Sequence, residues 1–311
     1  MNFKNRYKKI IFLITIFILT TACSQTEKKY HENGKLKEIG KYKDNKKTGI
    51  WNLYYDNGQL DKTIEYLNGE KNGEWKSYHY NGQLETIGEF KNGKENGEWN
   101  SFYSSGQLKE IRQYKDGIWF GEWKSYHSNG QLEVIGSIEN SKEIGEWKWY
   151  DYNGELELIG TFKEGKEIGE WKSYYGFNES QLKNIGKYSN GEKIGKWETY
   201  YITGELWSIT NYENGKKSGE YKSFSQNGEI VEYGQFKKGK KIGEWKFYDE
   251  EIESYFEGKY NENGQKIGKG IYYYPSNRKI KAVGFYEKGN KIGEWKYYLK
   301  NGKLDRIENR E

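Results

Sequence analysis

Cysteine and proline are almost absent from this chain of 311 residues. Cysteine occurs once, at Cys23, and proline once, at Pro275. A single cysteine forms no disulfide within the chain, so stability must come from packing alone. The hydrophobic fraction is only 34%, yet aromatic residues reach 18%. Disordered chains are poor in aromatics, so this composition favours a folded protein with many short strands and little deep core.

An excess of positive charge is missing outside the N-terminus. The formal net charge is +5, and four of these charges belong to Lys4, Arg6, Lys8 and Lys9. The rest of the chain has 47 basic and 46 acidic residues and is therefore nearly neutral. Proteins that bind nucleic acids carry a basic patch or stripe. We therefore expect no nucleic-acid partner.

Motifs for catalysis and metal binding are also missing. Histidine occurs only at His31, His79 and His127, with no cysteine or second histidine at a metal-binding spacing. The chain has no Gly-X-Ser-X-Gly elbow and no phosphate-binding glycine loop. Adjacent acids such as Glu250-Glu251 arise by chance in a glutamate-rich chain, and nothing marks a cleft between two carboxylates. We expect no enzymatic activity, no cofactor and no metal ion.

The N-terminus has the layout of a secretory signal. Residues 2–9 are basic and polar, residues 10–21 are almost wholly apolar, and Ala22 precedes Cys23. The apolar run is shorter than the ~20 residues that a membrane-spanning helix needs. The junction resembles the lipobox of bacterial lipoproteins, with Thr20 where that motif usually has leucine. In that family the signal is cut before the cysteine, which then receives a lipid.

This resemblance implies a division of the chain into three parts. Residues 1–22 would be a signal peptide cleaved after Ala22, residues 23–29 a tether lipidated at Cys23, and residues 30–311 the folded array. It also implies a place in the bacterial cell envelope, anchored to a membrane by lipid. In a bacterium with two membranes this would be the outer membrane or the cell surface. The alternatives are a plain signal peptide with an incidental cysteine and an uncleaved anchor.

A repeat of about 24 residues organises the rest of the chain. Each unit begins with Gly-X and an aromatic residue, and a second aromatic follows three positions later. A turn pair, two aliphatic residues and a closing aromatic come next, as in Asn81-Gly82, Leu84, Ile87 and Phe90. A fixed period of this length indicates an array of identical small units. The first aromatic residues of the units are Trp51, Trp75, Trp99, Trp123, Trp147, Trp171, Trp197, Tyr221, Trp245 and Trp295.

Turn residues divide each unit into two strands. Asn-Gly accepts positive φ at both central positions, so Asn81-Gly82 predicts a two-residue hairpin turn. A second, looser turn such as Asn92-Gly93 leads to the next Gly-X-Trp. No helical period of 3.6 competes with this alternation of strand and turn.

The predicted hairpin turn sets a register in which Trp75 pairs with Gly88. A large ring lying over a cross-strand glycine protects a weak position in a strand. We therefore expect the tryptophan of each unit to cover the glycine paired with it. The equivalent pairs are Trp123 with Gly136 and Trp147 with Gly160.

Consecutive hairpins of this kind predict an all-β fold, namely an elongated, coiled, single-layer antiparallel meander. Strand alternation places Trp75, Leu84 and Phe90 on one face and Tyr78 and Ile87 on the other. About ten to eleven units contain roughly twenty strands, which at about 4.8 Å each give an object on the order of 100 Å long. Open sheets of this width seldom stay flat, so the array should coil.

Four stretches depart from the repeat. Two extra residues between Phe177 and Ser180 lengthen one loop, which we interpret as an insertion tolerated at an exposed turn. Residues 249–253 are acidic and break the pattern, and residues 268–275 have lost the tryptophan. The polar end, residues 301–311, is typical of a capping unit.

The repeated pattern resembles the MORN repeat, in the variant form common in bacteria. Gly-Glu-Trp-Lys-X-Tyr-X-X-Asn-Gly-Gln-Leu, followed by Ile-Gly-X-Phe-Lys-X-Gly-Lys, recurs over about 280 residues. Residues 268–275 are closer to the more widespread MORN form. The resemblance implies an extended antiparallel sheet that serves as a scaffold or binding surface, without catalytic residues. Eukaryotic members are linked to membrane phospholipids and protein assembly, and some bacterial relatives look like antitoxin or immunity proteins.

Two recurring sets of side chains could contact a partner. Lysines such as Lys76 lie on the same face as glutamates such as Glu74, two positions earlier. We interpret them as a solvated face of mixed charge, rather than as a cationic ladder for acidic lipid or glycan. The tyrosine-rich face could stack sugars or hold a quaternary amine, but packing is the first explanation for its rings. His79 and His127 occupy the position of Tyr55 in their units, which we interpret as an ordinary surface position.

The sequence therefore favours a non-enzymatic cell-envelope lipoprotein that acts as a protein-binding or scaffold array. We expect another protein as the partner, and a membrane contact through the lipid at Cys23. One alternative is an antitoxin-like or immunity protein that neutralises a partner toxin. The other is an adhesin that binds glycan or cell wall. A toxin gene beside this one, or retention on purified wall polysaccharide, would distinguish them.

Overall fold

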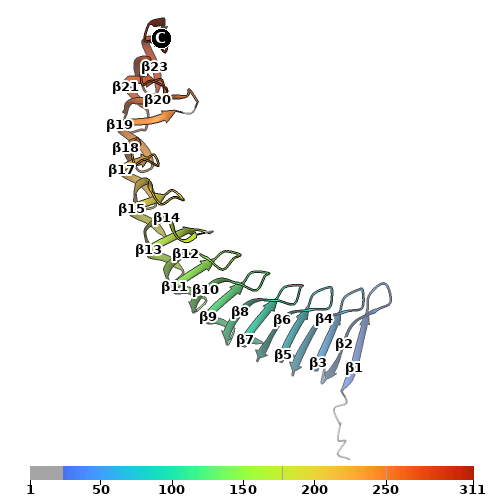
Figure 1. The fold of residues 1–311 in the computed structure, drawn as a ribbon. Coiled ribbons are helices and arrows are strands. Elements are labelled where there is room, and N and C mark those ends of the chain that lie inside the picture. The colour runs from blue at the N-terminus through green and yellow to red at the C-terminus, as the bar shows by residue number, and fades with distance from the viewer. Residues whose placement is uncertain (1–23, 177, 250) are drawn as a thin grey trace, which may run out of the picture.

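The computed structural model describes residues 24–176, 178–249 and 251–311. The predicted signal peptide (residues 1–22), Cys23 and Phe177 of the longer loop lie outside the described residues. Within them the chain forms 24 β-strands and no helix. Figure 1 shows these strands following one another in chain order along a long, curved ribbon. The predicted all-β, elongated array is confirmed.

Every strand pairs antiparallel with its neighbours in the sequence, from β1 with β2 to β23 with β24, so the sheet is a continuous meander. The strands are β1 (Gln25–Tyr30), β2 (Leu36–Lys43), β3 (Lys46–Tyr54), β4 (Leu60–Leu67), β5 (Glu70–Tyr78), β6 (Leu84–Lys91), β7 (Lys94–Phe102), β8 (Leu108–Lys115), β9 (Ile118–Tyr126), β10 (Leu132–Glu139), β11 (Lys142–Tyr150), β12 (Leu156–Lys163), β13 (Lys166–Tyr175), β14 (Asn178–Ser189), β15 (Glu192–Tyr200), β16 (Leu206–Glu213), β17 (Lys216–Phe224), β18 (Ile230–Lys237), β19 (Lys240–Asp249), β20 (Ser254–Tyr260), β21 (Lys266–Tyr273), β22 (Ile280–Glu287), β23 (Asn290–Tyr298) and β24 (Leu304–Arg310).

The sheet is longer than predicted because irregular segments also join it. The structure has 24 strands where roughly twenty were expected, and β21 forms although its unit has lost the tryptophan. The first strand begins at Gln25, which pairs with Tyr42, so the sheet starts inside the predicted tether, residues 23–29. A hydrogen bond from the His31 N–H to the Lys35 carbonyl (2.8 Å) closes this additional hairpin.

The two turns of each unit are the reverse of the prediction. The loop around Asn81-Gly82 is closed by hydrogen bonds from His79 N–H to the Gln83 carbonyl (2.8 Å) and from Gly82 N–H to the His79 carbonyl (2.7 Å). Of the Asn-Gly pair only Gly82 has positive φ, at 86°. This is a three-residue loop in which a type I turn is followed by a glycine bulge. The predicted two-residue turn at Asn81-Gly82 was therefore wrong.

The tight two-residue turns lie at the other end of the strands, where the looser turn was expected. Asn92 and Gly93 connect β6 to β7, with φ values of 51° and 77°. Positive φ at both central residues is the type I′ geometry, whose twist matches that of the flanking strands. An Asn-Gly pair thus forms the predicted turn type, but at the second turn of the unit.

A β-bulge at the glycine of Gly-X-Trp decides which ring covers which glycine. The predicted pairs are confirmed, namely Trp75 with Gly88, Trp123 with Gly136, and Trp147 with Gly160. The ring that lies on Gly88 nevertheless belongs to Trp99 of the next strand, since a Cβ added at Gly88 would be 2.1 Å from its Cδ2. Gly97 has a φ of 74°, and the register of β6 with β7 shifts opposite it. The bulge re-aims Trp99 onto the glycine, so the expected covering of Gly88 by Trp75 was wrong.

Leu84 lies on the other face from the one predicted. Residues paired directly across two strands project to the same side, and Leu84 pairs with Tyr78. The cause is a register shift just before Tyr78, which separates Leu84 from Trp75. Phe90 keeps its predicted place, because its ring contacts Trp99 edge-on with centroids 5.1 Å apart.

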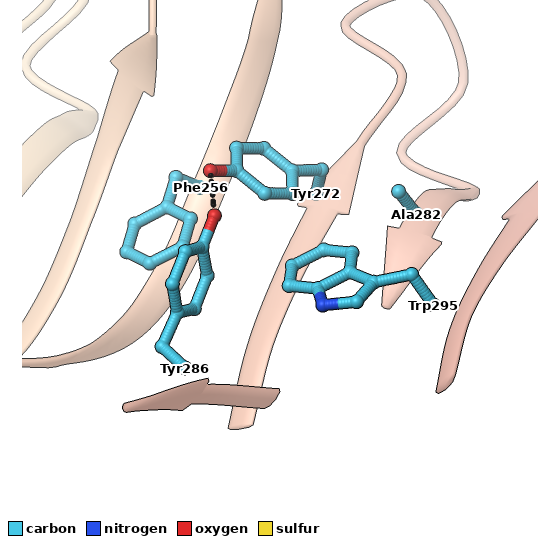
Figure 2. Packing of buried hydrophobic residues seen from close by; sticks show 5 residues of the cluster. All are labelled: Phe256, Tyr272, Ala282, Tyr286 and Trp295. Atoms are coloured by element: carbon cyan, nitrogen blue, oxygen red, sulfur yellow. Dashed lines mark hydrogen bonds between the residues drawn. The ribbon is translucent and has the colours of Figure 1, made fainter. Parts of the chain in front are cut away.

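Ring contacts along one face supply the core of this sheet. Trp51 and Trp295 are fully buried, although the sheet has only one layer. Figure 2 shows one of the clusters, near the C-terminus, where the hydroxyl oxygens of Tyr272 and Tyr286 are 2.7 Å apart. Aromatic pairs contribute about 0.5–1.5 kcal/mol each beyond the area they bury. Several rows of such pairs, one after another along the array, stabilise a sheet that no second layer covers. The buried members of this cluster are Phe256, Tyr272, Ala282, Tyr286 and Trp295.

Candidate binding faces

A one-layer sheet offers two large faces to a partner. We call the side with the first aromatic residue of each unit the aromatic face. The other side, which carries Lys76 and Glu74, is the charged face, because residues next to a tryptophan point away from it. Ile87 pairs with Lys76 and therefore lies on the charged face, which confirms its predicted place opposite Trp75.

Lysines on the charged face are held in ion pairs by the glutamates two positions earlier. Lys148 Nζ lies 2.9 Å from Glu146, and Lys172 Nζ lies 2.8 Å from Glu170. The hydrogen bond to glutamate raises the pKa of both lysines. Exposed pairs of this kind contribute only about 0.2–1 kcal/mol each, so they balance charge more than they stabilise. The face is of mixed charge, as interpreted from the sequence. The same pairing occurs at Lys76, Lys124, Lys222 and Lys296.

The histidines join neighbouring units by hydrogen bonds. His79 Nε2 lies 2.8 Å from the carbonyl oxygen of Phe102, and because a carbonyl only accepts, Nε2 carries the proton. The Tyr55 hydroxyl donates in the same way to the Tyr78 carbonyl at 2.6 Å. The interpretation as an ordinary surface position was therefore wrong, since either ring serves as a donor from one unit to the next. The equivalent contacts join His31 to Tyr54 and His127 to Tyr150.

The loop asparagine makes a second bond between units. Asn81 Oδ1 accepts from the Gln83 N–H at 3.0 Å, and its Nδ2 donates to the Ser104 carbonyl of the next unit at 2.8 Å. At the opposite edge, the Gly93 N–H of the type I′ turn donates to the Lys71 carbonyl of the preceding unit at 2.8 Å. Both edges of the array are thus hydrogen-bonded from unit to unit, and both faces stay available.

On the aromatic face, a lysine covers the tryptophan ring that follows it by four residues. We call this place the lid position. Lys47 Nζ is 3.9 Å from the centre of the Trp51 ring, and Lys193 Nζ is 4.0 Å from that of Trp197. Both distances are well within the ~6 Å of a cation–π contact. Burial lowers the pKa of Lys193, so its ammonium group is partly removed from water. At 4.3 Å the same contact joins Lys241 to Trp245 and Lys291 to Trp295.

Four consecutive units in the middle of the array lack a lysine at the lid position. Glu95, Trp119, Glu143 and Glu167 stand there instead. Glu167 pairs with an aromatic residue, Phe162, as the lid lysines do. The three glutamate carboxylates make no hydrogen bond or ion pair with any residue that the structure describes. The middle of the aromatic face therefore differs in charge from its two ends.

Half of the tryptophans gather in these same units. The chain has 12, and those at positions 99, 119, 123, 147, 149 and 171 lie here. We call Trp119, Trp123, Trp147, Trp149 and Trp171 the central tryptophan patch. Successive ring centroids in this order are 6.0, 5.5, 5.9 and 5.7 Å apart. Arg112 lies 5.3 Å over the Trp119 ring. Among the described residues no cation lies over the other four rings.

A small cavity of about 280 Å³ lies near the C-terminus. Its charged groups bind to the protein itself, because Lys281 Nζ donates to the Ile252 carbonyl at 2.7 Å and Lys291 Nζ lies 3.3 Å from the Tyr297 hydroxyl. Small-molecule sites usually measure about 300–1,000 Å³, so this cavity is at the lower limit. Its wall consists of Ile252, Ser254, Tyr272, Tyr274, Lys281, Ala282, Lys291, Tyr297, Tyr298, Asp305 and Arg306.

Comparison with protein families places the array in a known class. The profile of the MORN repeat variant matches nine segments, which together make up more than half of the chain. The chain belongs to the MORN repeat variant family. This confirms the resemblance drawn from the repeated Gly-Glu-Trp-Lys pattern. The unmatched parts of the MORN array include three of the four stretches where the sequence departs from its repeat, while the fourth, residues 301–311, lies within a matched segment. The matched segments are residues 26–44, 47–68, 71–92, 95–116, 121–140, 143–164, 193–214, 217–238 and 291–311.

No curated protein matches this MORN chain. Among solved structures, the crystal structure of TcdB2-TccC3 is similar over 93% of the chain, with 12% identity and a TM-score of 0.18. That of TcdB2-TccC3-Cdc42 is similar over 93%, with 13% identity and a TM-score of 0.18. The MORN chain spans only 19% and 18% of the length of those two chains.

MORN repeats indicate a repeat-based binding or scaffold role. The part of the chain that the structure describes has no group of three or more His, Cys, Asp or Glu side chains placed to hold a metal ion. It also has no helix long and apolar enough to cross a membrane. The lipidation predicted at Cys23 lies outside the described residues and stays a prediction.

The lid position of the MORN array was missed in the sequence. Its signal was present, because the residue four places before each tryptophan changes from lysine to Glu95, Trp119, Glu143 and Glu167, and back to lysine. The role of this residue could not be inferred from the sequence, because regular strand alternation does not bring its side chain over the tryptophan ring. The bulge at Gly-X-Trp does so in the structure.

Proposed function

We propose that this protein is a non-enzymatic lipoprotein of the bacterial cell envelope whose MORN array binds a partner protein along its aromatic face. The observation that carries the proposal is the central tryptophan patch on an uncovered sheet. Three members of the patch, Trp119, Trp123 and Trp149, are partly exposed, and tryptophan is enriched in protein interfaces. Stacked repeats of this kind create extended binding surfaces, which suits a partner that makes many small contacts.

The lipid at Cys23 would hold the first hairpin of the array at a membrane. Because β1 begins at Gln25, only Ser24 separates the lipidated residue from the sheet. The array would therefore project from the membrane surface by up to roughly 100 Å, its length at about 4.8 Å per strand. Cys23→Ala should move the protein from the membrane fraction to the soluble fraction. Retention of this variant in the membrane fraction would contradict the anchor.

Affinity capture from intact bacteria tests the binding function. The full chain, cross-linked in place and purified through a C-terminal tag, should enrich one defined protein. A second preparation, in which the loop between Phe177 and Ser180 is shortened to the length of the other loops, shows whether that loop takes part. Enrichment of no protein would contradict the proposal. Capture of a toxin that the array inactivates would favour the immunity role, and retention on purified wall polysaccharide would favour the adhesin.

A further inference from the structure

We propose that the central tryptophan patch, together with Glu143 and Glu167, docks an extended basic segment of the partner protein. Lysine or arginine side chains of that segment take the place that the chain's own lysines occupy in the flanking units. The inference rests on the proposed protein-binding function and adds the chemistry of the partner.

The flanking units show how the aromatic face holds an ammonium group. Lys193 Nζ lies 4.0 Å from the centre of the Trp197 ring and 5.5 Å from that of Tyr212. Lys47 Nζ is equally close to its own tryptophan, 3.9 Å from Trp51. Each cation thus contacts the tryptophan of its unit and an aromatic ring of the following strand, whose electron-rich faces attract it.

The central units keep the rings and lack the cation. Trp147 and Phe162 contact edge-on with centroids 5.6 Å apart, as Trp197 and Tyr212 do at 6.2 Å. Trp149 adds a further indole 5.9 Å from Trp147, at a position where several other units have serine. No cation of the described chain therefore occupies the place over these rings. Trp119, Trp123 and Trp149 are partly exposed and can be reached by a side chain from another protein, whereas Trp147 and Trp171 are buried beside them.

The lid glutamates supply charge that complements such a side chain. Neither Glu143 nor Glu167 has an ion-pair or hydrogen-bond partner for its carboxylate among the described residues. The carboxylates lie beside the type I′ turns of the following units, 3.3 and 3.5 Å from where a Cβ would stand on Gly165 and Gly191. A cation over the rings would gain both the indole contact and the carboxylate. Anionic lipid headgroups and nucleic acid would be repelled, so a basic protein segment is the occupant that these charges favour.

The repeat spacing also specifies the geometry of the segment. One unit advances the sheet by two strands, which is about 9.6 Å. Three residues of a peptide in the extended polyproline II conformation span about 9.3 Å and complete one turn, so every third side chain points the same way. A peptide that runs across the strands with a lysine at every third position therefore places one ammonium group over each successive unit.

Titration of tryptophan fluorescence with synthetic peptides tests the inference. The probe is acetyl-(Lys-Gly-Ser)₃-Lys-amide, and the comparison peptide has the same four lysines at every second position. With the full chain at about 0.15 M salt, where the Debye length is about 8 Å, the probe should bind more tightly than the comparison peptide. Glu143→Lys/Glu167→Lys should weaken its binding by about tenfold or more, because the carboxylates are lost and the new lysines occupy the place over the rings themselves. The milder pair Glu143→Gln/Glu167→Gln should weaken it by about threefold, and serves where the charge reversal alters the circular dichroism spectrum.

The matched control reverses two charges of the same strands on the charged face. Glu146→Lys/Glu170→Lys changes β11 and β13 by the same net charge and should leave binding within about twofold. Equal weakening in both double variants, or no binding of the probe to the unaltered chain, would overturn the inference. Undiminished capture of the natural partner by Glu143→Lys/Glu167→Lys would overturn it too, while leaving the proposed function intact. Failure of the unaltered chain to capture any protein would instead contradict the proposed function.

Discussion

Replacing Gly136 by alanine tests whether rings lying on glycines hold the sheet together. A Cβ at Gly136 would lie 2.1 Å from Trp147 Cδ2, whereas carbon atoms in contact are about 3.5–4.0 Å apart. The indole would have to move by about 1.5 Å to restore that separation. Trp147 is only 4% exposed and its ring contacts those of Trp123, Trp149 and Phe162, so any movement disturbs its neighbours.

The expected loss of stability follows from two opposing effects. Overpacking in a well-packed core costs about 1–3 kcal/mol. Alanine is favoured over glycine inside a strand by roughly 0.5–1 kcal/mol. We expect Gly136→Ala to lower the free energy of unfolding by about 1–2 kcal/mol in net terms. Urea unfolding followed by tryptophan fluorescence measures this loss. Ser137→Ala, the adjacent change on the charged face, is the control and should stay within about 0.5 kcal/mol.

A second background decides whether the ring is the cause. With Trp147→Leu in place, Gly136→Ala should cost little, because no indole remains to collide with the new methyl group. An equal cost in both backgrounds would refute the reasoning. In three units a residue larger than glycine stands at the equivalent position, and the ring of the next strand is partly exposed there, as Trp99 also is over Gly88. These pairs are Ile64 with Trp75, Arg112 with Trp123, and Thr210 with Tyr221.

Three further predictions concern the bonds between units and a buried tyrosine. His127→Phe should lower the free energy of unfolding by about 0.5–1.5 kcal/mol, because the Tyr150 carbonyl loses its donor, whereas His127→Tyr should be close to neutral in the same urea experiment. Asn129→Ala should cost about 1–2 kcal/mol in urea unfolding, since it removes bonds to the loop backbone and to the Tyr152 carbonyl. Burial raises the pKa of Tyr221 to about 12. Unfolded tyrosine titrates near pH ~10, so the resulting stabilisation is complete below that pH and is lost as the pH rises toward ~12. Thermal melts over this range should show a flatter decline for Tyr221→Phe.

Each of these three expectations can fail separately. Equal stability of the phenylalanine and tyrosine variants at His127 would contradict the bond between units. An unchanged urea midpoint in Asn129→Ala would show that the amide contributes nothing beyond solvation. Identical alkaline declines with and without the Tyr221 hydroxyl would contradict its raised pKa.

The periodicity of the sequence predicted the hairpins but not which turn of each unit is tight. Both Asn81-Gly82 and Asn92-Gly93 satisfy the chemistry of a two-residue turn. The decision comes from outside the hairpin, because the Asn81 amide bonds to the Ser104 carbonyl of the next unit. Reasoning within a single hairpin could not show this contact, so the two turns were exchanged in the prediction.

Register could be predicted from the sequence, whereas the direction of the rings could not. Counting from the loop paired Trp75 with Gly88, and the structure confirms that pair. Regular alternation then put the Trp75 ring on Gly88, but the bulge at Gly97 brings Trp99 there. A bulge adds one residue to a strand and re-aims the following side chain, which a strict period of two does not anticipate.

The sequence predicted the residue types of the candidate site but not how they are arranged. The tryptophans and the balanced charges of the lysine-glutamate pairs were visible in the sequence. The lid position was not visible, because the contrast between Lys193 and Glu143 can be recognised only when the ring next to each side chain is known. The histidines were placed with Tyr55 correctly, yet their common property, a hydrogen-bond donor at the end of a ring, became clear only from the carbonyl that each contacts.

Small-angle X-ray scattering tests the central claim most directly, namely that the repeats form one elongated, single-layer sheet. The 24 strands predict a length on the order of 100 Å and a radius of gyration on the order of 30 Å. A compact domain of 311 residues would have a radius of gyration of about 19 Å. A monomeric chain that scatters with a radius near the larger value supports the account. A radius near the smaller value would contradict it.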